Sequence, residues 1–182
     1  MASDRRQFRS TPEAIARLLL LIDAFSRQGN SERTIEGRVK LAKLDFFMRY
    51  PWHLAKVLAS RTGSEKARGR AESVLDASPV DSRMMRYRYG PWDPAYYALL
   101  GSLIGRGLIE TVPLGTRNGF GYRTTELGKQ LADNFRADES FRELDERAKD
   151  LRRHLDMSGT ALKNLVYSLP EVSDATWRED LQ

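Results

Sequence analysis

The sequence predicts a mainly α-helical protein with a small β-hairpin, built as a winged-helix-like core with N- and C-terminal helical extensions. Two observations carry this prediction. Between Met84 and Val112 the chain passes in quick succession through a strand pattern, a break and a capped helix. Directly afterwards, two strand-like segments enclose a turn-rich stretch of the kind that forms a wing, and another helix follows.

Residues 1–59 are expected to supply the N-terminal helices of the core. Thr11-Pro12-Glu13 is a typical helix start, because threonine caps a helix, proline fits its first turn and an acid suits its dipole. A second helix is predicted over about 33–49, where the apolar surface is wider than one stripe. A short third helix begins at Pro51 and fades by Ser60.

Charge is distributed unevenly along the chain. Residues 1–80 carry 15 basic and 9 acidic side chains, whereas residues 134–182 carry 8 basic and 11 acidic ones. Residues 60–82 are small, polar and charged, so they are predicted to form a mobile basic loop. This loop could touch phosphates, or it could simply be a solvated linker. The excess of positive charge in residues 1–80 is compatible with weak nucleic-acid affinity and equally with docking onto a protein partner.

Residues 83–136 are predicted to hold the strand, helix and wing of the winged-helix unit. Within Met84–Tyr89, largely cationic positions alternate with aromatic ones, which is typical of a half-buried strand. Gly90-Pro91 is expected to break this strand. Asp93-Pro94 then caps a helix, and Gly107 is placed to end it in a left-handed turn.

The wing is predicted from two strand-like segments on either side of a turn. Leu108–Val112 and Phe120–Thr124 are the expected strands, and the turn-rich residues 113–119 join them. Thr125-Glu126 is a typical helix start and opens the last helix of the unit.

Residues 137–182 are expected to form a C-terminal helical extension and tail. Apolar residues recur at helical spacing over Ser140–Leu155, and Ser158 is placed to cap a further helix that Pro170 ends. The acidic terminus contains Trp177. This tryptophan is predicted either to belong to a docking peptide or to pack back on its own domain.

Composition argues against an enzyme. The chain has no cysteine, and its two histidines, His53 and His154, lie far apart in ordinary helical contexts, so neither a metal site nor a catalytic residue is expected. The glycines of GTRNGFGYR precede no lysine with serine or threonine, so they predict a hairpin turn and no cofactor site. The apolar run Ala16–Ile22 is too short to span a membrane, and a cytoplasmic protein is expected.

The first candidate site is a group of arginines on the predicted strand and wing. Arginine binds phosphate well, but the same guanidiniums pair with the carboxylates of a partner or keep a surface soluble. Nucleic-acid phosphates are the predicted contacts of five residues: Arg83, Arg86, Arg88, Arg117 and Arg123.

The second candidate site is aromatic, because five of the ten tyrosines and tryptophans fall within residues 87–97. Aromatic residues interleaved with arginine make good interface anchors. Packing in the core is the alternative, and it is favoured for Tyr87, Tyr89 and Tyr96, whereas Trp92 and Tyr97 are favoured for contact. The predicted partner-binding residues are Tyr87, Tyr89, Trp92, Tyr97 and Trp177.

Four stretches of the chain resemble a known family. They are RLLLLIDAF, VKLAKLDFFMRYP, MMRYRYGPWDPAYYALLGSLIGRGLI and GYRTTELGKQLADNF. In this order they resemble the small middle component of bacterial three-component systems built around an ABC-type ATPase, a group that includes Lamassu anti-phage systems. The resemblance spans about residues 12–168, and RYRYGPWD with the following GRGLI is its most recognisable part.

The resemblance implies a non-catalytic adaptor that sits on an SMC-like ATPase beside a separate effector such as a nuclease. DNA ends and ATP would then be handled mainly by the ATPase, with non-specific DNA contact inside the complex. The alternative is a winged-helix DNA-binding transcriptional regulator. Its recognition helix would be 93–106, which offers almost no arginine, lysine, asparagine or glutamine to base edges.

Overall fold

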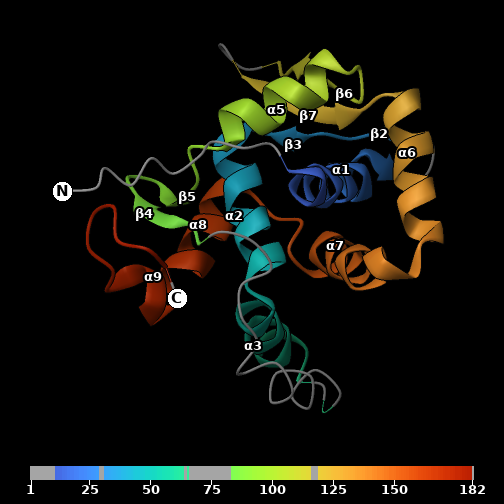
Figure 1. The fold of residues 1–182 in the computed structure, drawn as a ribbon. Helices are drawn as coiled ribbons and strands as arrows, with labels where there is room; N and C mark the ends of the chain where they lie inside the picture. Colours follow the sequence, from blue (N-terminus) through green and yellow to red (C-terminus); the bar gives the residue numbers. More distant parts are fainter. Residues whose placement is uncertain (1–10, 29–30, 64, 66–82, 116–118, 182) are drawn as a thin grey trace.

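The computed structural model describes residues 11–28, 31–63, 65, 83–115 and 119–181. The chain is mainly helical and carries small antiparallel sheets (Figure 1). Within the described residues, no helix is both long enough and apolar enough to cross a membrane. Most of the predicted basic loop, 60–82, lies outside the described residues.

The N-terminal part of the chain forms three helices and three two-residue strands. Its elements are α1 (Pro12–Ser26), β1 (Arg27–Gln28), β2 (Ser31–Glu32), β3 (Ile35–Glu36), α2 (Gly37–Arg49) and α3 (Pro51–Thr62). Thr11 caps α1 as predicted, because its side chain accepts a hydrogen bond from the backbone of Ala14. The predicted helix over 33–49 is wrong at its start. Its first residues form β3, and Gly37, with φ +72°, turns the chain into α2.

The middle of the chain forms two separate sheets and two helices. Its elements are β4 (Met85–Tyr87), β5 (Gly90–Trp92), α5 (Tyr96–Gly105), β6 (Ile109–Pro113), β7 (Phe120–Thr124) and α6 (Glu126–Ala137). The two strands predicted on either side of residues 113–119 are confirmed as the antiparallel pair β6–β7, and β3 extends this pair in the order β3-β7-β6.

The strand predicted at Met84–Tyr89 does not join this sheet. It forms its own two-stranded sheet with β5. The first strand ends at Tyr87, before Gly90-Pro91 as predicted, but these two residues also begin a second strand that was not predicted. Proline is tolerated there because β5 pairs on one side only. Helix α5 begins at Tyr96, three residues after Asp93, and Gly107 with φ +68° follows its end.

The C-terminal part packs helices against α1 and α2 and returns to β4. Its elements are η1 (Glu139–Phe141), α7 (Arg142–His154), α8 (Gly159–Tyr167) and α9 (Pro170–Ser173). Ser158 caps α8 as predicted. Pro170 does not simply end a helix, since it also opens α9.

Helix α1 lies at the centre of the fold. Figure 1 shows it among α2, α6, α7 and the β3–β7–β6 sheet, and every residue from Ala14 to Asp23 is buried. The core is therefore built around a helix that other elements cover on all sides. Even its charged residues Arg17 and Asp23 are buried.

A buried ionic network joins α1, α2 and the start of α5. The carboxylate of Asp45, on α2, lies 2.7 Å from Arg17 Nε and 3.0 Å from Arg49 Nε. The hydroxyl of Tyr96 donates to the same carboxylate at 2.7 Å. Arg49 also binds Asp93, at 2.7 Å. Two cations and two anions thus balance in a region where an unpaired charge would be costly.

The protonation states in this network follow from burial and from the neighbouring charges. Burial alone would raise the pKa of Asp45, but the charges of Arg17 and Arg49 hold it below its usual value. Burial and the Asp45 carboxylate raise the pKa of Tyr96 well above its usual value. The phenol therefore stays protonated and keeps donating to Asp45.

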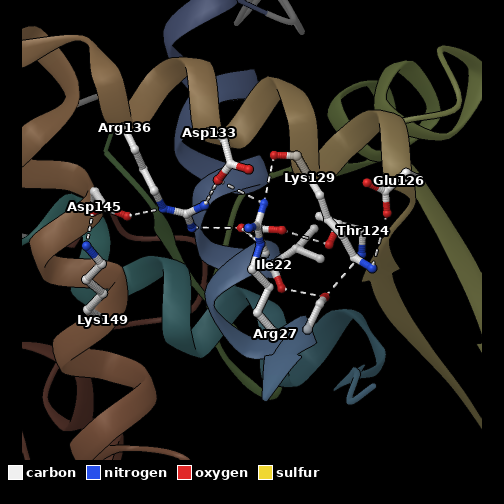
Figure 2. Close-up of polar contacts among 11 residues, drawn as sticks. Ile22, Arg27, Thr124, Glu126, Lys129, Asp133, Arg136, Asp145 and Lys149 are labelled. Atoms are coloured by element: carbon white, nitrogen blue, oxygen red, sulfur yellow. Dashed lines mark hydrogen bonds and ion pairs between the residues drawn. The ribbon is translucent and has the colours of Figure 1, made fainter. Parts of the chain in front are cut away.

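A second ionic cluster fastens α6 and α7 to α1 (Figure 2). Arg136, on α6, contacts Asp23 at 2.7 Å, Asp133 at 3.0 Å and Asp145 at 2.8 Å. Arg27 also contacts Asp23, at 2.8 Å. Asp23 is fully buried, so these two guanidiniums compensate a carboxylate that would otherwise be buried as a lone charge.

Replacing Asp45 tests the network on which this packing depends. Asp45→Asn leaves Arg17 and Arg49 buried together without their carboxylate, so the free energy of unfolding should fall by about 3–5 kcal/mol. Urea denaturation followed by circular dichroism measures it. Glu126→Gln is the matched control, because it removes an exposed ion pair with Lys129 and should cost less than about 1 kcal/mol.

The same comparison has a predicted pH dependence. The pKa of Asp45 is lower in the folded chain than in the unfolded chain, so its stabilising effect is present at neutral pH and is lost in acid. The difference between the native chain and Asp45→Asn should shrink as the pH falls below about 4. Equal stability of the two proteins at pH 7 would contradict the role given to this carboxylate.

Candidate functional site

The candidate site is a groove of about 540 Å³ between the first turn of α2, the β4–β5 hairpin, the start of α5 and the C-terminal tail. We call it the aromatic groove. It is lined by Arg38, Val39, Met85, Tyr87, Tyr89, Gly90, Pro91, Trp92, Pro94, Tyr97 and Arg178. Four of the five predicted partner-binding residues thus lie in one groove, and the fifth, Trp177, stacks on Tyr87 with ring centroids 4.9 Å apart.

The β4–β5 hairpin sets the aromatic wall of the groove. Tyr87 pairs with Gly90 across the two strands, and Met85 pairs with Trp92. The rings of Tyr87 and Trp92 approach diagonally, at 6.2 Å between centroids. Gly90 has φ +115°, a conformation that other residues rarely adopt, so the sharp return of the chain after Tyr89 depends on glycine.

Helix α5 sends neighbouring tyrosines to opposite sides. Tyr96 is 1% exposed and confirms the prediction of a core residue, whereas Tyr97 is 63% exposed in the groove. Trp92 lies between them, 5.2 Å from the ring of Tyr96 and 6.0 Å from that of Tyr97. The hydroxyl of Tyr96 donates to Asp45, which fixes the first turn of α5 and thereby the position from which the side chain of Tyr97 extends into the groove.

The prediction that Tyr87 and Tyr89 pack in the core is wrong. Tyr89 is 51% exposed and Tyr87 is 36% exposed. The core residue of this segment is Met84, whose backbone N–H donates to the hydroxyl of the buried Tyr50. Burial therefore does not alternate along this segment, because Met84 is buried, Met85 and Arg86 are half-buried, and the residues from Tyr87 to Tyr89 are exposed.

The C-terminal tail pairs with the free edge of β4. Arg86 exchanges two backbone hydrogen bonds with it, to the carbonyl of Glu179 at 2.7 Å and from the N–H of Arg178 at 2.8 Å. The N–H of Leu181 donates to Met84 at 2.7 Å. The tail thus packs back on its own domain, as one of the two predictions for this segment has it, while the side chain of Trp177 stays 56% exposed. That the segment docks onto a partner stays a prediction.

The predicted arginines do not gather in one place. Arg86 lies on β4 and Arg88 in the turn that joins it to β5, whereas Arg123 lies on β7. Arg117 lies outside the described residues. Arg86 turns toward its own domain, because its Nε donates to Val172 and its guanidinium lies over Tyr167. Arg123 pairs with Glu110 at 2.6 Å. Arg83 and Arg88 are exposed.

Sequence reasoning missed Arg38, Val39 and Arg178 as groove residues. Arg38 lies over the ring of Tyr97, 5.0 Å from its centroid. Val39 is 40% exposed. Placing 33–49 in one helix hid the turn at Gly37 that presents these two residues at a helix start. The available signal in the sequence was Gly37, which can end a strand and begin a helix.

Lys43 lies behind the groove, one turn after Val39 on α2. It is 3% exposed, and its Nζ donates to the carbonyl of Val39 at 3.5 Å. A side chain at Gly90 would lie 3.8 Å from its Cε atom. Burial, with a smaller effect from the charge of Lys163, lowers the pKa of Lys43 to about 8.

Two other features are weaker candidates. A cavity of about 660 Å³ between α1, α6 and α7 is lined by cationic side chains, but Arg27, Arg136 and Lys149 are held by Asp23, Asp133 and Asp145. Among the described residues, no three histidine or acidic side chains are placed to hold a metal ion. His53 is buried against Phe46 and Tyr50.

Comparison of the chain with protein-family models, with curated proteins and with solved structures gives no match. The residues of the aromatic groove are therefore interpreted from their own geometry and chemistry.

Lys43→Met tests whether the buried ammonium behind the groove costs the fold stability. The pKa of Lys43 is about 8 in the folded chain and about 10.4 when unfolded, so the native chain should become more stable between pH 8 and 10. Lys43→Met should remove this rise and increase the free energy of unfolding at pH 7 by about 1–3 kcal/mol. Denaturation across this pH range measures both effects. The exposed Lys56→Met should change neither, and a destabilised Lys43→Met would overturn the assignment.

Proposed function

We propose that the chain is a winged-helix adaptor subunit that holds a protein partner in its aromatic groove. The order of elements supports the winged-helix assignment. Along the chain come α1, β3, α2, α3, α5 and the β6–β7 hairpin, with the β4–β5 hairpin inserted before α5, and the sheet order is β3-β7-β6. In this assignment α5 takes the place of the recognition helix, and the segment between β6 and β7 is the wing.

The convergence of exposed aromatic rings in one groove carries the adaptor proposal. Tyr89 and Tyr97 line the groove with two arginines, and Trp177 packs against Tyr87 beside it. Each of the three exposes half or more of its surface, and large rigid rings of this kind dominate binding energy at interfaces. The described residues that line the groove include no carboxylate, imidazole, serine or threonine. They supply contact area and lack a nucleophile paired with a base, which favours binding over catalysis.

The resemblance to the small component of ABC-ATPase systems suggests the partner. We propose an SMC-like ATPase, with an effector such as a nuclease on the same complex, acting in the cytoplasm against phage. In this arrangement the ATPase carries out nucleotide chemistry, and the present chain bridges it to the effector. Any contact with DNA then occurs within the complex and without sequence readout.

The surface of α5 argues against the DNA-binding regulator. Its exposed positions include Tyr97, Ala98, Gly101 and Ile104, which offer few hydrogen-bonding groups to base edges. Arg86 and Arg123, two of the predicted phosphate contacts, are already engaged within the chain. The regulator remains as the second outcome of the test below.

Replacing exposed groove tyrosines should release the partner while the chain stays folded. The double variant Tyr89→Ala and Tyr97→Ala removes two largely exposed rings, so its free energy of unfolding should change by less than about 1 kcal/mol. Affinity purification from the native host should recover a large coiled-coil ATPase with the native chain at high salt, and at least tenfold less with the variant. Leu127→Ala, an exposed apolar residue on α6, is the control and should retain the partner.

A regulator would behave differently in the same experiment. The chain would be recovered with nucleic acid at low salt and without it at high salt. Reversing the exposed Arg88 to Glu would reduce that recovery, and the tyrosine variant would leave it unchanged. This result would contradict the adaptor proposal.

A further inference from the structure

We infer that the occupant of the aromatic groove is an acidic segment of the partner protein that inserts an aromatic side chain. This inference rests on the proposed function and goes beyond it, because it names the chemistry of the partner segment. Two observations carry it. Among the described residues no carboxylate pairs with the arginines that line the groove, and the chain's own Trp177 packs its ring against Tyr87 of the same groove.

The arginines at the groove differ from most others in the fold. Arg17, Arg27, Arg49 and Arg136 each bind one or more carboxylates. Within the described part of the chain, by contrast, no carboxylate lies within ion-pair distance of Arg38 or Arg178, the two arginines that line the groove. Arg38 lies over the ring of Tyr97 instead, and Arg88, next to the groove residue Tyr89, lies over the ring of that tyrosine.

This pattern selects an acidic occupant. A groove lined by aromatic rings and two arginines accepts an aromatic side chain with carboxylates beside it. A basic segment would be repelled by the same guanidiniums, and a neutral one would leave them without a partner. Arg38 is also held in place by Tyr97, so little side-chain freedom is lost when it binds a carboxylate.

The C-terminal tail already places an aromatic ring on the hairpin. Its backbone exchanges hydrogen bonds with Arg86, the chain turns at Trp177 and Arg178, and the ring of Trp177 packs against that of Tyr87. The hairpin therefore holds a segment with a tryptophan inside the same molecule, through backbone hydrogen bonds and ring contact. The groove beside it offers three further rings, Tyr89, Trp92 and Tyr97, to an aromatic side chain of a partner.

Single-stranded nucleic acid is the competing occupant, since bases also stack on aromatic residues and phosphates also bind arginine. The described lining supplies only Arg38, on α2, and Arg178, in the C-terminal tail, as cations, and a nucleic-acid strand is usually tracked by a continuous basic groove. The peptide is therefore favoured, and an oligonucleotide serves as the second probe.

The experiment titrates the full chain into three fluorescein-labelled probes and follows their anisotropy. The probes are the peptide GDEWEDG, its basic counterpart GKKWKKG, and a twelve-nucleotide oligo-dT. The acidic peptide should bind more tightly than either of the others, and its affinity should fall as salt is raised. GDEAEDG, which lacks only the aromatic anchor, should bind at least tenfold more weakly.

Arg38→Glu provides the decisive variant. Position 38 is in the first turn of α2, where an acidic residue suits the helix dipole, so the variant should fold. It should weaken binding of the acidic peptide at least tenfold. The control is Arg106→Glu, an exposed arginine at the opposite end of α5 from Tyr97, which should bind as the native chain does.

The outcomes separate this inference from the proposed function. If neither peptide binds, but the tyrosine variant still releases the ATPase in the host, the adaptor proposal stands and the acidic-segment inference fails. If oligo-dT binds best and Arg38→Glu abolishes its binding, the occupant is nucleic acid and the inference is overturned. If the native chain recovers no partner at all, the proposed function fails as well.

Discussion

The buried carboxylate of Asp45 is the constraint on which the rest of the structure depends. It lies at a point where α1, α2 and the start of α5 meet, and it holds Arg17, Arg49 and Tyr96 at once. Buried ions stabilise a fold only when every charge is matched, so these groups must be brought together in one arrangement. That requirement fixes the position of α5 relative to the two N-terminal helices more closely than apolar packing alone would.

The aromatic groove is a consequence of this arrangement. Arg49 also holds Asp93, whose carboxylate accepts a hydrogen bond from the backbone of Ala95 and so positions the first turn of α5. With Tyr96 tied inward, Tyr97 must point outward, because successive residues of a helix are rotated by about 100°. The hairpin before Asp93 and the turn at Gly37 complete the groove from two sides. The buried groups of Asp45, Arg49 and Tyr96 therefore set the geometry of the groove residues that are proposed to bind a partner.

Features that depend on local chemistry could be predicted from the sequence. Helix caps at Thr11, Thr125 and Ser158 and the β6–β7 pair were all found, since each depends on residues close together in the chain. Strand β3 was missed because two residues in a helical pattern become a strand only by pairing with β7. The tail on β4 is likewise a long-range pairing. The exposure of Tyr87 and Tyr89 was missed for the same reason, because which face of a strand is buried depends on what covers it.

Site-specific photo-crosslinking in the native host tests the central claim, that the aromatic groove holds a protein partner, most directly. The photoreactive residue p-benzoylphenylalanine would replace Tyr97 in one strain and the exposed Leu127 in another. Irradiation should join the chain to a large coiled-coil ATPase from position 97 and not from position 127, and the joined peptide should be acidic. A cross-link from position 127 alone, or a cross-link from position 97 to nucleic acid, would contradict the account.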